Sequence, residues 1–244
     1  MTQGPETKEH NMILYGDLHA NCNGALDLIK TDALVKKYGE AVLKQKYLVI
    51  LGDGGFLWKN SPYCARGGEL LKAFDAMPWK TICVAGNHEN FEDIYDEYNL
   101  TTVDGQPFYQ ISDKVFYFKR YGCYTLENKK LLVLGGAASI DKAIRQEGVS
   151  WFSEECLSPD EQKDIVKNLC GSYDAVLAHT LPHSIARIHL NGSPLFHDDN
   201  SIFFEKLQQI ISFNYWFCGH FHNNDEIIAG TRKYEVLYFK TIIY

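Results

Sequence analysis

The stretch Met12-Ile13-Leu14-Tyr15-Gly16-Asp17-Leu18-His19 joins a short apolar run to a turn that carries two polar side chains. The apolar residues Met12 to Tyr15 predict a buried strand, which Gly16-Asp17 ends. Apolar residues then recur at a helical spacing within Gly24 to Lys37, so a helix is expected there. Strand, loop and helix in this order form the first unit of an α/β sheet, an architecture that binds ligands at its strand ends.

The same unit recurs within the first 90 residues. Tyr47–Leu51 predicts a second strand that ends at Gly52-Asp53, and a helix is expected over Glu69–Met77. Thr81–Val84 predicts a third strand, which ends at Gly86. Each of these strands therefore ends in a glycine beside Asp, Asn or His, at the edge where open α/β sheets place their ligands.

The remainder of the chain is predicted to be richer in short strands. They are expected at Val115–Tyr121, Cys123–Leu126, Leu131–Leu134, Ala175–Ala178, Tyr215–Phe217, Glu226–Ala229 and Tyr234–Phe239. Glu127–Lys130 is the expected turn of one hairpin, and Gly230 lies at the turn of a closing hairpin. This half of the chain is therefore expected to add further strands rather than repeat the first units.

Two helices and one long connection complete the predicted elements. A helix is expected over Pro159–Leu169, because Ser158 and Glu161 have the spacing of a capping box and proline suits the first helical position. A second helix is expected over Ile202–Ile211. The stretch Ser184–Asn200 is interpreted as a long loop, either ordinary or a lid over a site.

Composition excludes several classes of protein. The chain has 244 residues and 45% hydrophobic content, which is enough for one large domain with a true core. Lys plus Arg number 24 against 31 Asp plus Glu, a formal charge of −7, so no broad basic field for nucleic acid is expected. The longest apolar runs are too short to span a membrane, and the polar first ten residues do not resemble a signal peptide.

The seven cysteines are widely spaced and contain no CxxC pair. This pattern argues against both a disulfide framework and a structural zinc site. A cytoplasmic location, where thiols stay reduced, fits this cysteine usage best. The chain is therefore interpreted as a single cytoplasmic domain over residues 1–244, with residues 1–11 as a flexible tail.

Five polar clusters directly follow five predicted strands. They are Gly16-Asp17-Leu18-His19, Gly52-Asp53, Gly86-Asn87-His88-Glu89, Ala178-His179 and Gly219-His220-Phe221-His222. Glycine lets the backbone leave a strand sharply, and residues two apart in an extended segment point to the same side. Two metal ions could therefore share one pocket. Ordinary turn chemistry is the alternative for each cluster alone, but five turns in this order disfavour it.

This ordered set resembles the signature of the calcineurin-like metallophosphoesterase superfamily, which reads GDxH, GD, GNH[ED], a lone H and GHxH. The resemblance spans positions 16–222, and the segment Gly135–Trp151 is similar to that of small bacterial and phage-like members. It implies an α/β fold, a four-layer α/β/β/α sandwich of two mixed β-sheets flanked by helices. The metal site is then expected at the C-terminal ends of the strands.

Carried over residue by residue, the resemblance implies two metal ions that share Asp53. The ligands of one would be Asp17, His19, Asp53 and His222, and those of the other Asp53, Asn87, His179 and His220. A carboxylate suits the bridging position, because it offers two anionic oxygens. A mixed nitrogen and oxygen set favours divalent or trivalent Mn, Fe, Zn, Ni or Co over Ca. The sequence leaves the choice among these metals open.

The reaction implied by the resemblance is hydrolysis of a phosphomonoester or a small phosphodiester. A hydroxide bridging the metals at Asp53 attacks phosphorus, and His88 gives a proton to the leaving group. Glu89 or Asp93 could orient the His88 ring. Two alternatives remain: a non-catalytic protein-binding scaffold on the same fold, and a nuclease, which the acidic charge disfavours. The sequence does not specify the oligomeric state.

The expected substrate contacts differ from those of the Ser/Thr protein phosphatases. Those enzymes carry an arginine after the second motif and another before the third, whereas here Gly54-Gly55 follows Asp53 and Ala85 precedes Gly86. A different basic residue is expected to bind the phosphate, namely Arg66, Arg145 or Arg187, with Asn87 as a further contact. A protein-phosphatase function is therefore disfavoured.

Overall fold

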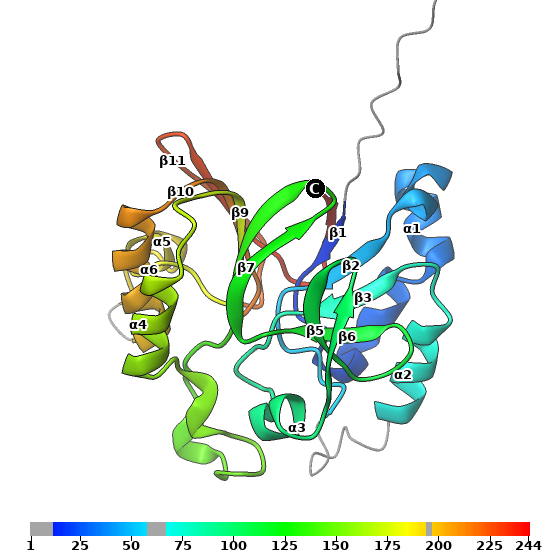
Figure 1. Ribbon diagram of the computed structural model, residues 1–244, viewed down its shortest axis with the longest axis horizontal. Coiled ribbons are helices and arrows are strands. Elements are labelled where there is room, and N and C mark those ends of the chain that lie inside the picture. The colour runs from blue at the N-terminus through cyan, green and yellow to red at the C-terminus, as the bar shows by residue number, and fades with distance from the viewer. Residues whose placement is uncertain (1–11, 58–66, 194–196) are drawn as a thin grey trace, which may run out of the picture.

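The computed structural model describes residues 12–57, 67–193 and 197–244. The expected tail over residues 1–11 and the predicted phosphate contact Arg66 lie outside these ranges. Two mixed β-sheets pack face to face, with α1 and α2 covering one outer face and α4, α5 and α6 the other (Figure 1). The four-layer α/β/β/α fold predicted from the sequence is confirmed.

The first sheet has seven strands in the order β13-β1-β2-β3-β6-β5-β4. Their bounds are β1 Ile13–Tyr15, β2 Tyr47–Ile50, β3 Lys80–Cys83, β4 Leu100–Val103, β5 Gln106–Gln110, β6 Val115–Phe118 and β13 Thr241–Ile243. The four strands β1, β2, β3 and β6 are parallel, and antiparallel strands form both edges. The carboxyl ends of β1, β2 and β3 therefore meet at one edge of the sheet.

The second sheet has six strands in the order β11-β12-β10-β9-β8-β7. Their bounds are β7 Tyr121–Leu126, β8 Lys129–Leu134, β9 Ser172–Ala178, β10 Ser212–Cys218, β11 Asp225–Ala229 and β12 Arg232–Val236. The strands β8, β9, β10 and β12 are parallel. Glu127 and Asn128 both have positive φ and form a two-residue turn between β7 and β8, inside the predicted turn.

The helices lie mostly on the outer faces. Their bounds are α1 Thr31–Tyr38, α2 Gly67–Asp75, α3 Phe91–Tyr95, α4 Pro159–Lys167, α5 His183–His189 and α6 Asp199–Ile210, with 3-10 turns η1 His19–Leu28, η2 Glu40–Lys44, η4 Lys142–Ile144 and η5 Ser153–Glu155. The capping box predicted before α4 is present, since Ser158 Oγ accepts from Glu161 N–H and Glu161 accepts from Ser158 N–H. Among the described residues, no helix is both long enough and apolar enough to cross a bilayer.

Three apolar cores separate the four layers. Leu14 of β1 and Met12 just before it belong to the core between the sheets, together with Val133 and Leu177 of the second sheet. Ile13 and Tyr15, which point the other way from β1, belong to the core beneath α1 and α2. The central strands thus bury both faces, which explains why they appear in the sequence as continuous apolar runs.

Several sequence predictions of the elements were incomplete or wrong. The helix expected over Gly24–Lys37 is divided into η1 and α1, because Lys30 is extended and interrupts it. The stretch Ser184–Asn200 was interpreted as a loop or lid, but its first residues belong to α5 and its last two to α6. The short elements α3, β4, β5 and β13 were not predicted. The expected strand Tyr234–Phe239 ends early, and the chain then crosses to the first sheet as β13.

Candidate metal centre

The seven predicted ligands converge where the strand ends of both sheets meet. Those of the first sheet follow β1, β2 and β3, and those of the second follow β9 and β10. Among the described residues, two groups of carboxylate and imidazole atoms lie within 4.8 Å of one another: Asp17, His19 and His222, and Asp17, Asp53 and His179. Side chains far apart in sequence therefore form one polar cluster.

Asp53 belongs to the second of these groups, and Asp17 is common to both. Its Oδ1 accepts the backbone N–H of His88 at 2.9 Å. Its Oδ2 is buried and, within the described part of the chain, has no hydrogen-bond partner. The Nε2 atoms of His19 and His179 lie 3.7 and 3.4 Å from that oxygen. A buried carboxylate oxygen is costly unless a cation compensates it, so this oxygen fits a metal ion.

Asp17, His19 and His222 form the more exposed side of the cluster. The Nε2 atoms of His19 and His222 are 2.9 Å apart, and they lie 3.8 and 3.6 Å from Asp17 Oδ2. The backbone N–H of His220 donates to both Asp17 oxygens at 3.0 Å, which fixes the carboxylate. Two ring nitrogens and a carboxylate oxygen thus face a common point, a donor set that suits a transition metal.

Asn87 faces the other side of the cluster. Its Oδ1 lies 3.0 Å from His179 Nε2 and 3.0 Å from His220 Nδ1. The opposite nitrogen of His179 is 2.7 Å from the Leu51 carbonyl, a contact that leaves Nε2 facing the site. The Asn87 oxygen and two imidazole nitrogens therefore converge, as expected for the second predicted ligand set.

The motif glycines are required by the close packing of the site. A Cβ on Gly52 would lie 2.0 Å from His179 Nδ1. One on Gly86 would lie 2.0 Å from Asp53 Oδ1, and one on Gly219 would lie 2.0 Å from Asp17 Oδ1. Each of these glycines therefore makes room for a site side chain that follows a different strand, in addition to allowing a sharp strand exit.

Four site residues adopt a left-handed backbone. The φ angles are 47° at His19, 51° at Asp53, 72° at His220 and 53° at His222. Non-glycine residues rarely adopt this conformation, which costs about 1–3 kcal/mol at each position. The surrounding structure must therefore impose it, and it directs these side chains into the cluster.

The charges of the site shift the pKa values of its own groups. Burial opposes ionisation of Asp53, but the neighbouring His179 and His88 outweigh it and hold the pKa of Asp53 well below its usual range. Burial also opposes charging of His179, but Asp53 and Asp17 raise its pKa to about 9. Burial and the charge of His179 lower the pKa of His220 to about 3, so His220 stays neutral, the form that binds metals.

A buried relay orients the Asn87 amide. Asn87 Nδ2 donates to Ser139 Oγ at 2.8 Å. Ser139 in turn donates from Oγ and from its backbone N–H to the Glu155 carboxylate, at 2.6 and 3.0 Å. All three side chains are buried. The relay turns Asn87 Oδ1 toward the imidazoles. Ser139 lies in the segment Gly135–Trp151 that the family resemblance covers, but no role was predicted for it, and Glu155 belongs to no sequence motif.

His88 and Arg145 lie together at the part-buried mouth of the cluster. Arg145 Nη1 is 2.7 Å from His88 Nδ1, and Asp141 accepts from Arg145 Nε and Nη2 at 2.5 and 2.7 Å. Glu89, expected as a possible orienting group, instead accepts from Gly54 N–H and Tyr117 OH. Among the described contacts of the His88 ring, Arg145 takes the orienting position.

Arg187 is another basic residue predicted to bind the phosphate and lies within the described residues. Arg187 lies on α5 with an exposed side chain, and its helix packs against α6 and β11.

The family is decided by a match over most of the chain. The family model of calcineurin-like phosphoesterases matches residues 11–224. The chain belongs to this family. Calcineurin-like phosphoesterases are metal-dependent phosphate ester hydrolases, so the enzyme class predicted from the sequence is confirmed. A search of curated protein sequences finds no match.

Several solved structures are similar to this chain at low sequence identity, and the one with a TM-score of 0.50 has the same fold. A dimetal phosphatase from Danio rerio has 11% identity and a TM-score of 0.50, over 94% of this chain and 87% of that chain. Phosphopantetheinyl hydrolase from Mycobacterium tuberculosis has 14% identity and a TM-score of 0.46, over 94% and 90%. A putative 5'-nucleotidase from Staphylococcus aureus has 13% identity and a TM-score of 0.48, over 96% of this chain but only 50% of that chain.

Proposed function

We propose that this calcineurin-like phosphoesterase hydrolyses a phosphomonoester or small phosphodiester with two transition-metal ions, Mn, Fe, Zn, Ni or Co. The proposed ligands are Asp17, His19, Asp53 and His222 for one ion and Asp53, Asn87, His179 and His220 for the other. The observation that carries the proposal is the buried Asp53 Oδ2, which accepts no hydrogen bond from the described residues and has the Nε2 atoms of His19 and His179 3.7 and 3.4 Å away. One anionic oxygen between two groups of ligands supports a shared cation-binding carboxylate.

The proposed chemistry divides between the ions and the protein. Two bound ions would lower the pKa of a shared water and neutralise charge on the phosphoryl oxygens. The protein holds the ligands rigidly, since Ser139 fixes Asn87, and the Leu51 carbonyl fixes His179. Binding of metal would also displace the proton from His179, whose pKa is about 9. Metal affinity is therefore expected to rise with pH over this range.

His88 and Arg145 are proposed to act on the substrate. Arg145 is anchored by Asp141, while Nη1 points at the His88 ring. A phosphoryl group bound at this mouth would meet a guanidinium and an imidazole side by side. The guanidinium would neutralise phosphoryl charge, and the imidazole would give a proton to the leaving oxygen. Burial lowers the pKa of His88, Asp53 opposes this and Arg145 adds to it, so the protonated ring is a stronger acid than a free imidazolium.

We also propose a cytoplasmic location for the protein. The cysteines whose side chains are described are all free thiols, which fits a reducing compartment. The substrate is proposed to be small, because the catalytic residues lie among buried groups at strand ends rather than on a broad basic surface.

The test is hydrolysis of an aryl phosphate and a bis-aryl phosphodiester by Mn-loaded protein. We expect turnover of one or both, loss of activity in Asp53→Asn, and a fall of about 10²–10⁴-fold in kcat for His88→Asn. Elemental analysis should find about two metal ions per chain. Asp32→Asn, an exposed position on α1, is the matched control and should keep full activity. Inactive wild-type protein across several metals and both esters would overturn the proposal.

A further inference from the structure

Two cysteines lie in contact near the start of β9, whereas His179 of the candidate metal centre follows the end of that strand. Cys123 belongs to β7, and Cys170 follows α4 just before β9. Their sulfur atoms are 3.2 Å apart. A disulfide bond is about 2.0 Å long, so the sulfurs need to approach by only about 1 Å. Side-chain rotation supplies such a shift without rearrangement of the strands.

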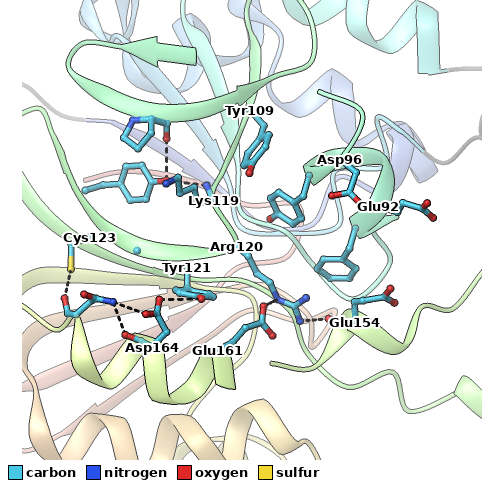
Figure 2. A pocket seen from close by; sticks show the side chains of 16 residues that line it. Glu92, Asp96, Tyr109, Lys119, Arg120, Tyr121, Cys123, Glu154, Glu161 and Asp164 are labelled. Carbon is cyan, nitrogen blue, oxygen red and sulfur yellow. Dashed lines mark hydrogen bonds and ion pairs between the residues drawn. The ribbon is translucent and has the colours of Figure 1, made fainter. Parts of the chain in front are cut away.

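The surroundings hold the two thiols in this arrangement. Tyr173 OH accepts the backbone N–H of Cys170 at 2.7 Å and lies 3.2 Å from Cys123 Sγ. Cys123 Sγ also points at the Asn168 carbonyl, 3.7 Å away, at the end of α4 (Figure 2). One tyrosine hydroxyl thus contacts both cysteines, and the pair is fixed from both sides.

One member of the pair, Cys123, lines an open cavity that is separate from the metal centre. This cavity has a volume of about 970 Å³, and Cys123, Tyr121 and Asp164 form one of its walls (Figure 2). None of the proposed metal ligands lines it. Cys170 is exposed, and Cys123 is partly buried. Small solutes therefore reach the pair directly from solvent.

The other described thiols differ in environment. Cys83 and Cys218 are buried in apolar cores, and burial raises the pKa of both well above its usual value. No group of three metal-binding side chains in the described residues includes Cys123 or Cys170. The pair is therefore suited to dithiol chemistry rather than to metal binding.

We propose that Cys123 and Cys170 form a reversible disulfide when the protein meets a peroxide, which makes this wall of the cavity a redox-sensitive site. The Cys170 thiolate attacks one oxygen of hydrogen peroxide, which breaks the O–O bond and gives a sulfenic acid and a hydroxide ion; the hydroxide becomes water by taking up the proton that the thiol released. The Cys123 sulfur then attacks the Cys170 sulfur, and the S–S bond forms as the second water leaves. Two electrons pass from the sulfurs to the peroxide, and a dithiol reductant reverses the reaction.

The order of the two steps follows from exposure. Cys170 is the more accessible thiol, whereas burial raises the pKa of the Cys123 thiol and slows its direct reaction with peroxide. Cys123 is already in contact with Cys170, so it captures the sulfenic acid before a second peroxide can. The bond would then join β7 to the connection between α4 and β9, which secures one wall of the cavity.

The test is to treat the protein with hydrogen peroxide, from an equimolar amount up to an excess over protein, and to analyse the product by mass spectrometry. We expect a loss of about 2 Da, two fewer titratable thiols, and a peptide that joins Cys123 to Cys170. Dithiothreitol should restore the mass. The oxidised form should melt roughly 5–10 °C higher, because the crosslink restricts the unfolded chain.

Matched variants separate this pair from general oxidation. Cys123→Ser and Cys170→Ser should each abolish the 2 Da loss, whereas Cys156→Ser, at a partly buried thiol outside the pair, should retain it. Peptide mapping of the wild type decides the outcome even if a variant folds poorly. Sulfinic acid on Cys170 beside a free Cys123 thiol, a disulfide to any other cysteine, or no oxidation of either residue would overturn the proposal.

Discussion

Glu89 is a buried carboxylic acid next to the candidate metal centre. It accepts hydrogen bonds from Gly54 N–H at 2.7 Å and Tyr117 OH at 3.1 Å. Burial and the nearby charge of Asp53 nevertheless raise its pKa to about 8, because the two hydrogen bonds only partly oppose them. The folded protein therefore keeps a proton on Glu89 at pH values where the unfolded chain has lost it.

This shift predicts a pH-dependent stability. The pKa of Glu89 in the folded protein lies above its ordinary value, so protonated Glu89 favours the folded state. This contribution to the free energy of unfolding is fully present below about pH 4.5 and is lost as pH rises through about 8. Glu89→Gln, which cannot ionise, should gain stability relative to wild type by up to about 1.4 kcal/mol per pH unit across this window. Urea unfolding at about pH 5 and about pH 8, in chelator, measures the difference. Glu92→Gln, exposed on α3, is the control, and parallel curves for Glu89→Gln and wild type would contradict the prediction.

Among the helices and strands, the sequence predicted those whose formation depends on a local pattern of residues. The central strands β2 and β9 bury both faces and therefore appear in the sequence as apolar runs. The N-terminal cap of α4 is formed by two side chains three residues apart, so it could be predicted from local sequence. By contrast, β4 is a short edge strand with alternately exposed residues, and β13 has three residues whose register is set by β1. Their pairing depends on tertiary structure, which no local pattern records.

The candidate site divides in the same way. The ligands were predicted from the resemblance to the family signature, because each belongs to a short local motif such as Gly16-Asp17-Leu18-His19. Glu155 was missed, since it belongs to η5 and reaches Asn87 only through Ser139, which follows β8. Contacts between loops of different sheets are set by the fold, so sequence patterns alone did not reveal this support.

The relay between these loops gives a second prediction. Glu155→Gln replaces one acceptor of the Ser139 hydrogen bonds by a donor, so the Asn87 amide should lose its fixed orientation. We expect metal affinity to fall roughly 10–100-fold. Metal titration followed by calorimetry measures this directly. Glu154→Gln changes the neighbouring, exposed carboxylate and should bind metal as wild type does. Equal affinity in the two variants would show that Glu155 does not position Asn87.

For the whole molecule, the candidate centre connects two independently hydrogen-bonded sheets. Asp17 and Asp53 follow strands of the first sheet, whereas His179 and His220 follow strands of the second. Metal would bind these residues only in the folded state, because the unfolded chain cannot bring them together. Occupancy of the site and stability of the sandwich are therefore expected to be linked.

Removal of metal tests this linkage. Treatment of Mn-loaded protein with a chelator should lower Tm by roughly 5–10 °C, and added Mn should restore it. Asp53→Asn should show a much smaller response to both treatments, which makes it the control for effects of the chelator itself. An unchanged Tm, with elemental analysis proving that the metal had left, would mean that the site does not stabilise the sandwich.

The left-handed backbone at His19, Asp53, His220 and His222 sets a limit on engineering of this chain. Glycine at any of these positions would relax the backbone, so selection for thermal robustness alone would favour it. Each such replacement would also delete a side chain from the cluster. Screens for variants that tolerate heat should therefore keep these four positions unchanged, because a glycine there could raise thermal tolerance while removing a side chain that catalysis needs.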